Sequence, residues 1–249
     1  MPLPAPSADF RWIHHRALND QAHLKEGREA AARLPNLKHF FESDVCWAAD
    51  GAKRIFYFRH PDRLTDEWSA KRVLDARKAG ELIFLEDLAG FTDQNERYVL
   101  EIKIGPGSPF DAMDDLYDQL RATNLPDDRF VIDGYSRRLL MHLHARDAML
   151  PLTMHMEDMF ADRAWVTAPR TDFTIRRLEP LRWLTAINLR WWGSEARLRR
   201  RAATIARKGL AFQLSRLNDA QRLQTAIEVG AAGGYAKSDL ILEYAAAMG

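Results

Sequence analysis

The sequence has a single cysteine, Cys46, so the chain cannot form an intrachain disulfide bond. This scarcity fits a reducing compartment. No apolar run approaches the roughly 20 residues that a membrane-spanning helix needs. The N-terminal stretch "MPLPAPSADF" also lacks the basic start and the apolar segment of a signal peptide. We therefore expect a cytoplasmic protein without stable membrane insertion.

Neither positively nor negatively charged residues are in excess. The 249 residues carry 36 Lys and Arg against 35 Asp and Glu, a formal net charge of +1. This balance argues against nucleic acid as a partner. The basic stretch at 197–208 is better interpreted as the solvated face of a helix than as a surface for lipid or nucleic acid. The sequence does not indicate the oligomeric state.

Short apolar runs alternate with amphipathic stretches along the whole chain. The expected strands are 11–17, 39–48, 53–58, 98–105, 129–135, 150–156, 184–190, 210–215 and 233–236. The expected helices are 20–34, 65–79, 109–123, 136–147, 194–208 and 218–229. This alternation predicts βαβ units and a parallel sheet. The number of units and the chain length favour a (β/α)8 TIM barrel, an α/β fold, as one domain over 1–249.

Two local features refine this expectation. No expected strand is followed by a G-x-G-x-x-G turn, which argues against a dinucleotide-binding fold. Asp50-Gly51 separates two strands and predicts a hairpin turn between them. In a barrel the functional residues lie at the C-terminal ends of the strands, so polar residues there are the candidates.

Two expected strands carry charged residues two positions apart, which places both side chains on one face. These pairs are Glu42 with Asp44, and Glu101 with Lys103. Carboxylates on an inward face repel one another and lose solvation unless a cation lies between them. Hard oxygen ligands favour one Mg²⁺ or Ca²⁺. The alternatives are a solvated outward face for the first pair and a self-neutralising ion pair for the second.

Histidines follow two other expected strands. His14, His15 and Arg16 end the first strand, and His60 follows the expected hairpin. A histidine pair can exchange protons near neutral pH. His14 and His15 face opposite sides of a strand, and parity alone does not say which side is the inside. A surface role is the alternative for His60.

At this point the order of the motifs resembles that of the glycerophosphodiester phosphodiesterases, which have a phosphatidylinositol phosphodiesterase-like TIM barrel. That family opens with a His-Arg-Gly strand end, followed by Glu-x-Asp, a histidine after a hairpin, and Glu-Leu-Lys. The corresponding residues here are His15-Arg16-Ala17, Glu42-Ser43-Asp44, His60 and Glu101-Ile102-Lys103. The segment "GLAFQLSRLNDAQRLQTAIEVGAAGGYAKSDL" is similar to the family's closing pattern. The resemblance spans nearly the whole chain.

The resemblance implies a metal-dependent phosphodiesterase that acts on a small-molecule diester. Glu42, Asp44 and Glu101 would hold the divalent cation. Arg16 and Lys103 would bind the phosphate. His15 would act as the base and His60 as the acid, although the reverse assignment is also open. The product would be an alcohol and a phosphomonoester, reached directly or through a cyclic phosphate.

Several departures from the family pattern concern specificity. Ala17 replaces the glycine, Pro61 replaces the aspartate after the second histidine, and Ser215 replaces a tryptophan before Asn-Asp. Trp191 and Trp192 would line the pocket in place of that tryptophan, or pack in the core. The short stretch between His60 and Glu101 implies a trimmed insert, as in sphingomyelinase D-like phospholipases and opine phosphodiester enzymes.

Two alternatives for function stay open. One is a phospholipase D-like or phosphodiester-forming reaction on the same barrel, and the other is a non-catalytic barrel that binds a phosphorylated ligand. His155 and Glu157 follow another strand end and could touch the substrate, but we prefer to interpret them as polar residues of a loop. Cys46 is expected to be an inert thiol. We also expect His142 and His144 to be structural residues of a helix.

Overall fold

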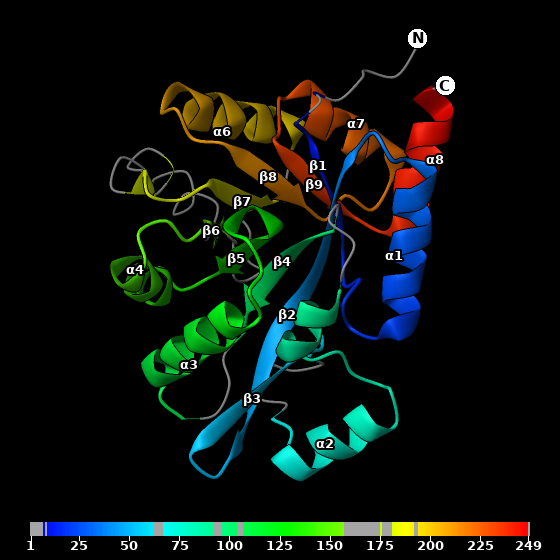
Figure 1. Ribbon diagram of the computed structural model, residues 1–249. Helices are drawn as coiled ribbons and strands as arrows, with labels where there is room; N and C mark the ends of the chain where they lie inside the picture. The colour runs from blue at the N-terminus through cyan, green and yellow to red at the C-terminus, as the bar shows by residue number, and fades with distance from the viewer. Residues whose placement is uncertain are drawn as a thin grey trace.

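The computed structural model describes residues 7, 9–61, 67–91, 96–103, 107–156, 175, 181–191 and 194–248. Its strands form one sheet, ordered β1-β9-β8-β7-β6-β5-β4-β2-β3, which closes through an additional pairing of β1 with β2 (Figure 1). The eight strands other than β3 pair in parallel, so the sheet is a closed barrel. The expected (β/α)8 fold is therefore confirmed.

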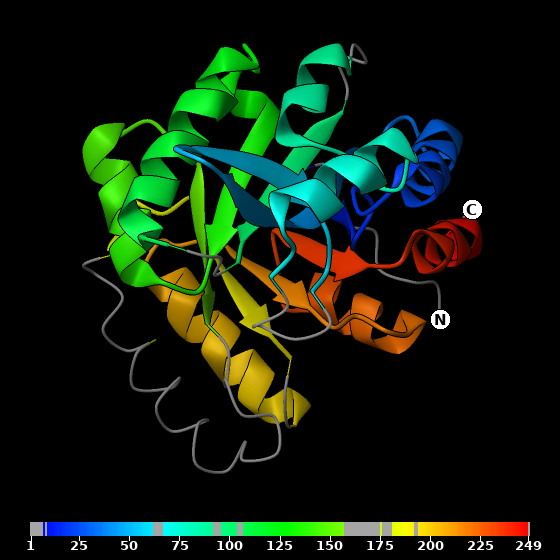
Figure 2. The same cartoon turned by 90° about the horizontal axis from the view of Figure 1, so that it is seen from below.

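The expected elements follow one another in the predicted order with small shifts in their bounds, and within the described residues three helices that were not expected are added to them. The strands are β1 (Arg11–His14), β2 (Lys38–Asp50), β3 (Lys53–Phe58), β4 (Arg97–Ile102), β5 (Phe130–Gly134), β6 (Leu152–Met156), β7 (Ala186–Arg190), β8 (Phe212–Ser215) and β9 (Gly233–Ala236). The α-helices are α1 (Gln21–Arg33), α2 (Ala70–Lys78), α3 (Pro109–Ala122), α4 (Arg137–Arg146), α6 (Glu195–Arg207), α7 (Ala220–Glu228) and α8 (Ser238–Met248). Two 3₁₀ helices are η1 (Leu85–Gly90) and η2 (Asp127–Arg129). Figure 2 shows the helices around the strands.

Local sequence signals account for many of the helix starts. Side chains of Asp20, Ser69, Ser108, Ser136 and Asp219 each accept a hydrogen bond from a backbone N–H in the first turn of the helix that follows. Such caps satisfy donors that have no partner within the helix. The caps therefore fix where the chain leaves a strand end and enters a helix.

The hairpin also forms as expected. β2 and β3 are antiparallel, and Asp50 pairs with Lys53 across the turn. Gly51 has a φ of 61°, a left-handed conformation that glycine adopts without strain. β3 lies outside the barrel, and its side chains pack with those of β2, α2 and the segment just before η1 in a small separate core. The hairpin therefore extends β2 and places His60 beside the C-terminal mouth of the barrel.

The inside of the barrel begins with an apolar layer. Ile13, Phe40, Val99, Val131 and Tyr235 form one buried cluster at its centre. Because side chains alternate along a strand, residues two and four positions further along face the same interior. This register sends the polar residues at the C-terminal strand ends into the mouth of the barrel. A larger apolar cluster packs the strands against the surrounding helices.

α8 is a helix that the sequence analysis did not anticipate. It follows β9 directly, and it lies beside α1 (Figure 1). None of the helices in the described parts of the chain is long and apolar enough to cross a membrane.

Gly233 provides a test of this packing. A Cβ atom at this position would lie 2.9 Å from both the Cβ and the backbone oxygen of Arg11 on the neighbouring strand. We expect Gly233→Ala to destabilise the fold by about 1–3 kcal/mol, because backbone atoms cannot move aside as side chains do. Urea unfolding measures the change. The control is Gly90→Ala, since no atom lies within 4 Å of a Cβ there; equal unfolding midpoints for the two variants would contradict the expectation.

Candidate active site at the mouth of the barrel

A cavity of about 1100 Å³ opens at the C-terminal ends of the strands. Most of the residues expected to be functional line it: His15, Arg16, Asp44, His60, Glu101, Lys103 and Ser215. Glu42 is buried below the cavity, at 1% exposure. The strand ends thus bring together residues that are far apart in the sequence.

Three carboxylates form the core of the site. Ligand atoms of Glu42, Asp44 and Glu101 all lie within 4.8 Å of one another, and all three residues are buried. The strand register explains this proximity, because Asp44 on β2 pairs directly with Glu101 on β4. Because side chains alternate along a strand, Glu42 lies on the same inward face as Asp44. The structure therefore places this expected pair inside the barrel rather than on a solvated face.

The electrostatics of these carboxylates favour a cation. Burial and the neighbouring carboxylates raise the pKa of Glu42 well above its usual range, and burial together with Glu101 raises the pKa of Asp44 to about 7. Asp44 Oδ2 is also buried without a hydrogen-bond partner among the described residues. A divalent ion would remove this repulsion and supply the missing partner. The donor set therefore fits Mg²⁺ or Ca²⁺.

Lys103 lies beside these carboxylates. Its ammonium group contacts Glu101 and lies 3.1 Å from Asp44 Oδ1. Burial alone would lower the pKa of Lys103, but the two carboxylates raise it above its usual range, so the side chain stays charged. Lys103 thus keeps a positive charge beside the acidic group, and its contacts include a self-neutralising pair with Glu101, the alternative considered for this strand.

The two adjacent histidines of β1 point in opposite directions. His14 is fully buried outside the barrel, where its Nδ1 lies 2.9 Å from Ser238 Oγ and its Nε2 lies 2.9 Å from His39 Nδ1. His15 instead lines the cavity, because it shares the inward face of Ile13. The structure thus shows that His15, and not His14, faces the inside of the barrel, which the sequence alone did not decide.

His15 has the protonation state of a base. Its partial desolvation in the cavity, followed by the charge of Arg16, lowers its pKa to about 4. His15 is therefore neutral at neutral pH and can accept a proton. His60 lies on the hairpin side, with its Nε2 3.9 Å from Asp44 Oδ2.

Arg16 connects the first strand end to the carboxylates. Its backbone N–H donates to Glu42 Oε2 at 2.8 Å. Its φ is 65°, a left-handed conformation that is strained for a residue with a side chain. The Arg16 side chain lines the cavity with His15. In the family motif a glycine follows the arginine, at the position of Ala17 in this chain. Here the positive φ occurs at Arg16 itself.

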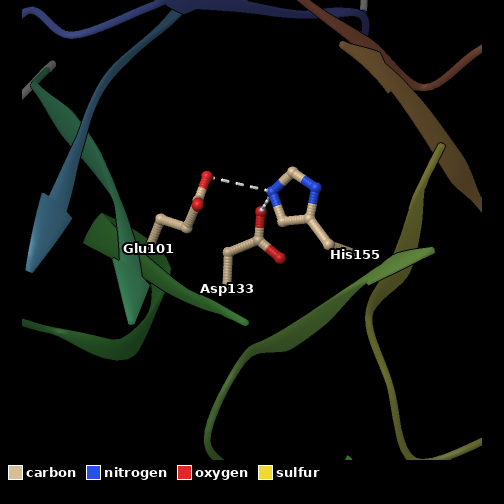
Figure 3. A group of neighbouring side chains, drawn as sticks. All are labelled: Glu101, Asp133 and His155. Atoms are coloured by element: carbon tan, nitrogen blue, oxygen red, sulfur yellow. Dashed lines mark ion pairs between the residues drawn. The ribbon is translucent and has the colours of Figure 1, made fainter. Parts of the chain in front are cut away.

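One buried group beneath the carboxylates was not anticipated from the sequence. His155 was expected in a polar loop, and this was wrong: it lies on β6 at 7% exposure, inside the barrel (Figure 3). Its Nε2 is 2.8 Å from Asp133 Oδ2 and 3.1 Å from Glu101 Oε2. Burial would lower the pKa of His155, but these carboxylates raise it to about 10, so the ring is a cation. Glu157 lies outside the described residues.

This cation affects Glu101 directly. Burial alone would raise the pKa of Glu101, but His155 and Lys103 hold it well below its usual range. Asp133 is held in turn by the Tyr235 hydroxyl at 2.9 Å and the Asn188 amide at 3.1 Å. Glu101, Asp133 and His155 could also enclose a metal, but their direct ion pairs already offset the two negative charges in part. Glu42, Asp44 and Glu101 are therefore the better candidates for holding a cation.

The remaining candidates divide between cavity and core. Ser215 lines the cavity, whereas Trp191 is 9% exposed and belongs to the hydrophobic core. Trp191 thus packs in the core, which was one of the two positions considered for it. Trp192 lies outside the described residues. Cys46 is half-buried, and its thiol contacts the backbone oxygen of Arg59 at 3.3 Å. His142 lies on α4, where its Nε2 is 2.9 Å from Asp114 Oδ1.

Comparisons with known proteins agree with this architecture. A protein from Silicibacter pomeroyi, provisionally assigned as a glycerophosphoryl diester phosphodiesterase, has a TM-score of 0.69 at 12% identity, over 99% of this chain and 96% of its own. A glycerophosphodiester phosphodiesterase from Parabacteroides distasonis has a TM-score of 0.66 at 14% identity, over 96% and 98%. A phosphodiesterase from Oleispira antarctica, solved with the product sn-glycerol-3-phosphate, has a TM-score of 0.65 at 15% identity, over 99% and 97%.

These similarities establish the fold class. The chain is a (β/α)8 barrel with the overall architecture of solved glycerophosphodiester phosphodiesterases. No protein-family model matches the sequence, and the search of curated proteins found no match. Function therefore has to be argued from the residues of the site.

Proposed function

We propose that the chain is a metal-dependent phosphodiesterase that cleaves a glycerophosphodiester-like small molecule. The observation that carries this proposal is the convergence of three buried carboxylates, two cavity histidines and two cationic side chains at the mouth of one barrel. A carboxylate pair alone would also suit glycoside hydrolysis. Glycoside hydrolysis does not need the histidines or the cationic side chains of Arg16 and Lys103.

Each side chain has a distinct role in this proposal. Glu42, Asp44 and Glu101 hold one Mg²⁺ or Ca²⁺, which supplies a positive charge for the nonbridging phosphate oxygens when bound. Arg16 and Lys103 bind the same oxygens and stabilise the charge that develops on them during the reaction. The likeness to the Oleispira phosphodiesterase, which was solved with a glycerol phosphate product, supports a substrate of this class.

The two histidines move the protons. A water or a neighbouring hydroxyl of the substrate attacks phosphorus, and its proton passes to Nε2 or Nδ1 of neutral His15. The P–O bond to the leaving alcohol breaks, and its oxygen takes a proton from His60. Attack by water gives an alcohol and a phosphomonoester, whereas attack by the substrate hydroxyl gives an alcohol and a cyclic phosphate. Phosphorus NMR of the products distinguishes these outcomes.

The adjacent histidines allow a matched test of this assignment. We expect His15→Ala to lower turnover of glycerophosphodiesters by roughly 10²- to 10⁴-fold, the usual contribution of a general acid or base. The control is His14→Gln, which changes the neighbouring residue outside the barrel. Initial rates are measured at a temperature at which circular dichroism shows both variants folded. Parent-like turnover in His15→Ala, or an equal loss in both variants, would remove His15 from the mechanism.

A further inference from the structure

The wall of the cavity opposite the carboxylates is cationic. Arg190 ends β7, Arg216 follows β8, and Lys237 follows β9; all three line the cavity. The order of strands around the closed barrel places β7 and β8 across from β2 and β4. Arg190 and Arg216 are therefore separated from the carboxylates by the width of the mouth, whereas Lys237 follows β9, which pairs with β1 beside His15. None of them has a role in the mechanism described above.

The backbone directs the first of these cations into the cavity. Arg190 lies two residues beyond Asn188, whose side chain meets Asp133 and His155 inside the barrel, so it faces the same interior. Arg190 pairs in register with Ser215 on β8. Ser215 Oγ is buried and has no hydrogen-bond partner among the described residues. Ser215 thus places a small side chain with a hydroxyl group next to the guanidinium of Arg190.

Arg216 is held in an unusual conformation. Its φ is 65°, the same strained region that Arg16 occupies on the phosphate side. A non-glycine residue in this region is disfavoured, and such residues are concentrated at functional sites. The backbone oxygen of Arg216 accepts a hydrogen bond from Arg222 at 3.2 Å, which helps to hold the turn. Burial and the nearby Arg222 charge lower the pKa of Arg216, as expected where cations gather.

Carboxylates line other parts of the cavity. Besides the metal group, the described lining contains Glu26 and Glu29 of α1 and Asp239 of α8. Glu29 lies 3.9 Å from Lys25, and Asp239 accepts a hydrogen bond from the backbone N–H of Leu240. No acidic residue of the described lining comes from β7, β8 or the turns that directly follow them. Among the described residues, the charged side chains on that wall are therefore cations.

We propose that Arg190 and Arg216 form a second anion subsite, so that the preferred diester carries another anionic group on one of its alcohols. This proposal rests on the proposed phosphodiesterase function. Guanidinium groups bind planar carboxylates and phosphates through paired hydrogen bonds. The Ser215 hydroxyl is placed to donate to the same group. The substrate class is thus a phosphodiester with a carboxylate or a second phosphate across the cavity from the cleaved bond.

Three matched diesters test this subsite. Each joins glycerol 3-phosphate to glycerol, to glycerate or to a second glycerol phosphate, so only the distal charge differs. We expect kcat/KM of the parent protein to be at least about tenfold higher for one anionic diester than for the neutral one, the effect of one charge-assisted hydrogen bond. The favoured diester identifies the group as carboxylate or phosphate. In Arg190→Gln and Arg216→Gln this ratio falls to about 2 or less.

The control is Arg200→Gln, which removes the same charge from an exposed residue of α6 and keeps the parent ratio. Equal kcat/KM values for all three diesters in the parent would overturn the subsite and leave the phosphodiesterase proposal intact. A parent ratio that persists in both cavity variants would also overturn it.

A binding measurement decides the case in which no diester is cleaved. That result would reject the proposed function, and calorimetry with 3-phosphoglycerate and glycerol 3-phosphate then tests the subsite by itself. Binding of 3-phosphoglycerate that is at least about tenfold tighter, and that loses this advantage in Arg216→Gln, supports the subsite. Equal affinities for the two compounds would overturn it. Comparison with the variant separates side-chain binding from chelation of the Mg²⁺ in the buffer.

Discussion

Replacing Glu101 with glutamine is expected to lower phosphodiester turnover by at least about 10³-fold and to weaken divalent-cation binding by at least about 10-fold. Glu101 is a member of the three-carboxylate group and contacts both Lys103 and His155. The amide keeps the shape of the side chain but removes the negative charge that a hard cation requires. Initial rates and calorimetric titration with Mg²⁺ and Ca²⁺ measure the two effects.

The control for this variant is Glu81→Gln, which makes the same chemical change at an exposed position before η1. It is expected to keep parent rates and parent cation affinity. Glu101→Gln with unchanged cation affinity would show that the ion binds elsewhere. Weakened cation binding with full turnover would show that the reaction does not depend on the metal, contrary to the proposed mechanism.

The second large effect concerns stability. Replacing His155 with leucine is expected to destabilise the protein by about 3–5 kcal/mol, because it leaves buried carboxylates without their cation. His155 is 7% exposed and lies within 3.1 Å of oxygens of both Glu101 and Asp133. The measurement is urea unfolding in EDTA, so that a bound ion does not compensate for the lost charge.

A double variant separates lost charge from lost packing. Asp133→Asn combined with His155→Leu removes a buried negative charge together with the cation. We expect its destabilisation to be at least about 1 kcal/mol smaller than the sum of the two single changes, since contacting residues are not additive. Strict additivity would mean that His155 contributes through packing alone.

The sequence contained enough information for the fold and for the outline of the site. Runs such as 130–134 and 152–156 are short and apolar, and they alternate with capped helices, so the barrel could be anticipated. The period-two pairs at Glu42 and Glu101 were informative because a charge within a covered strand needs a partner. Their convergence depends on the pairing of Asp44 with Glu101, which is a property of the folded sheet.

The site residues that were missed show what a single sequence lacks. Asp133 lies in the apolar stretch "RFVIDGY", two residues after the inward-facing Val131, and the same argument as for Glu101 would have selected it. His155 lies one residue before the end of a strand, and it looks like part of a polar loop until β5 and β6 are placed side by side. Its charge arises from carboxylates on two other strands. Likewise, only the folded register shows that His15 faces the interior and that Trp191 belongs to the core.

The opposite directions of His14 and His15 also illustrate how the fold divides two kinds of chemistry. Burial, followed by the nearby His39, lowers the pKa of His14 to about 3. Its hydrogen bonds to Ser238 and His39 link the start of α8 to β1 and β2. His15, one residue later, opens into the cavity with Arg16. A strand end thus carries a structural histidine and a candidate base on its two faces.

The most direct test of the central claim is the turnover of bis(p-nitrophenyl) phosphate and of a glycerophosphodiester panel in Mg²⁺, in Ca²⁺ and in EDTA. The account predicts that at least one diester is cleaved with either cation, that EDTA abolishes turnover, and that adding the cation back restores it. Turnover that is equally fast in EDTA would contradict the assignment of Glu42, Asp44 and Glu101 as a catalytic metal site. The absence of cleavage of every diester, despite calorimetric binding of the cation, would contradict the proposed phosphodiesterase function.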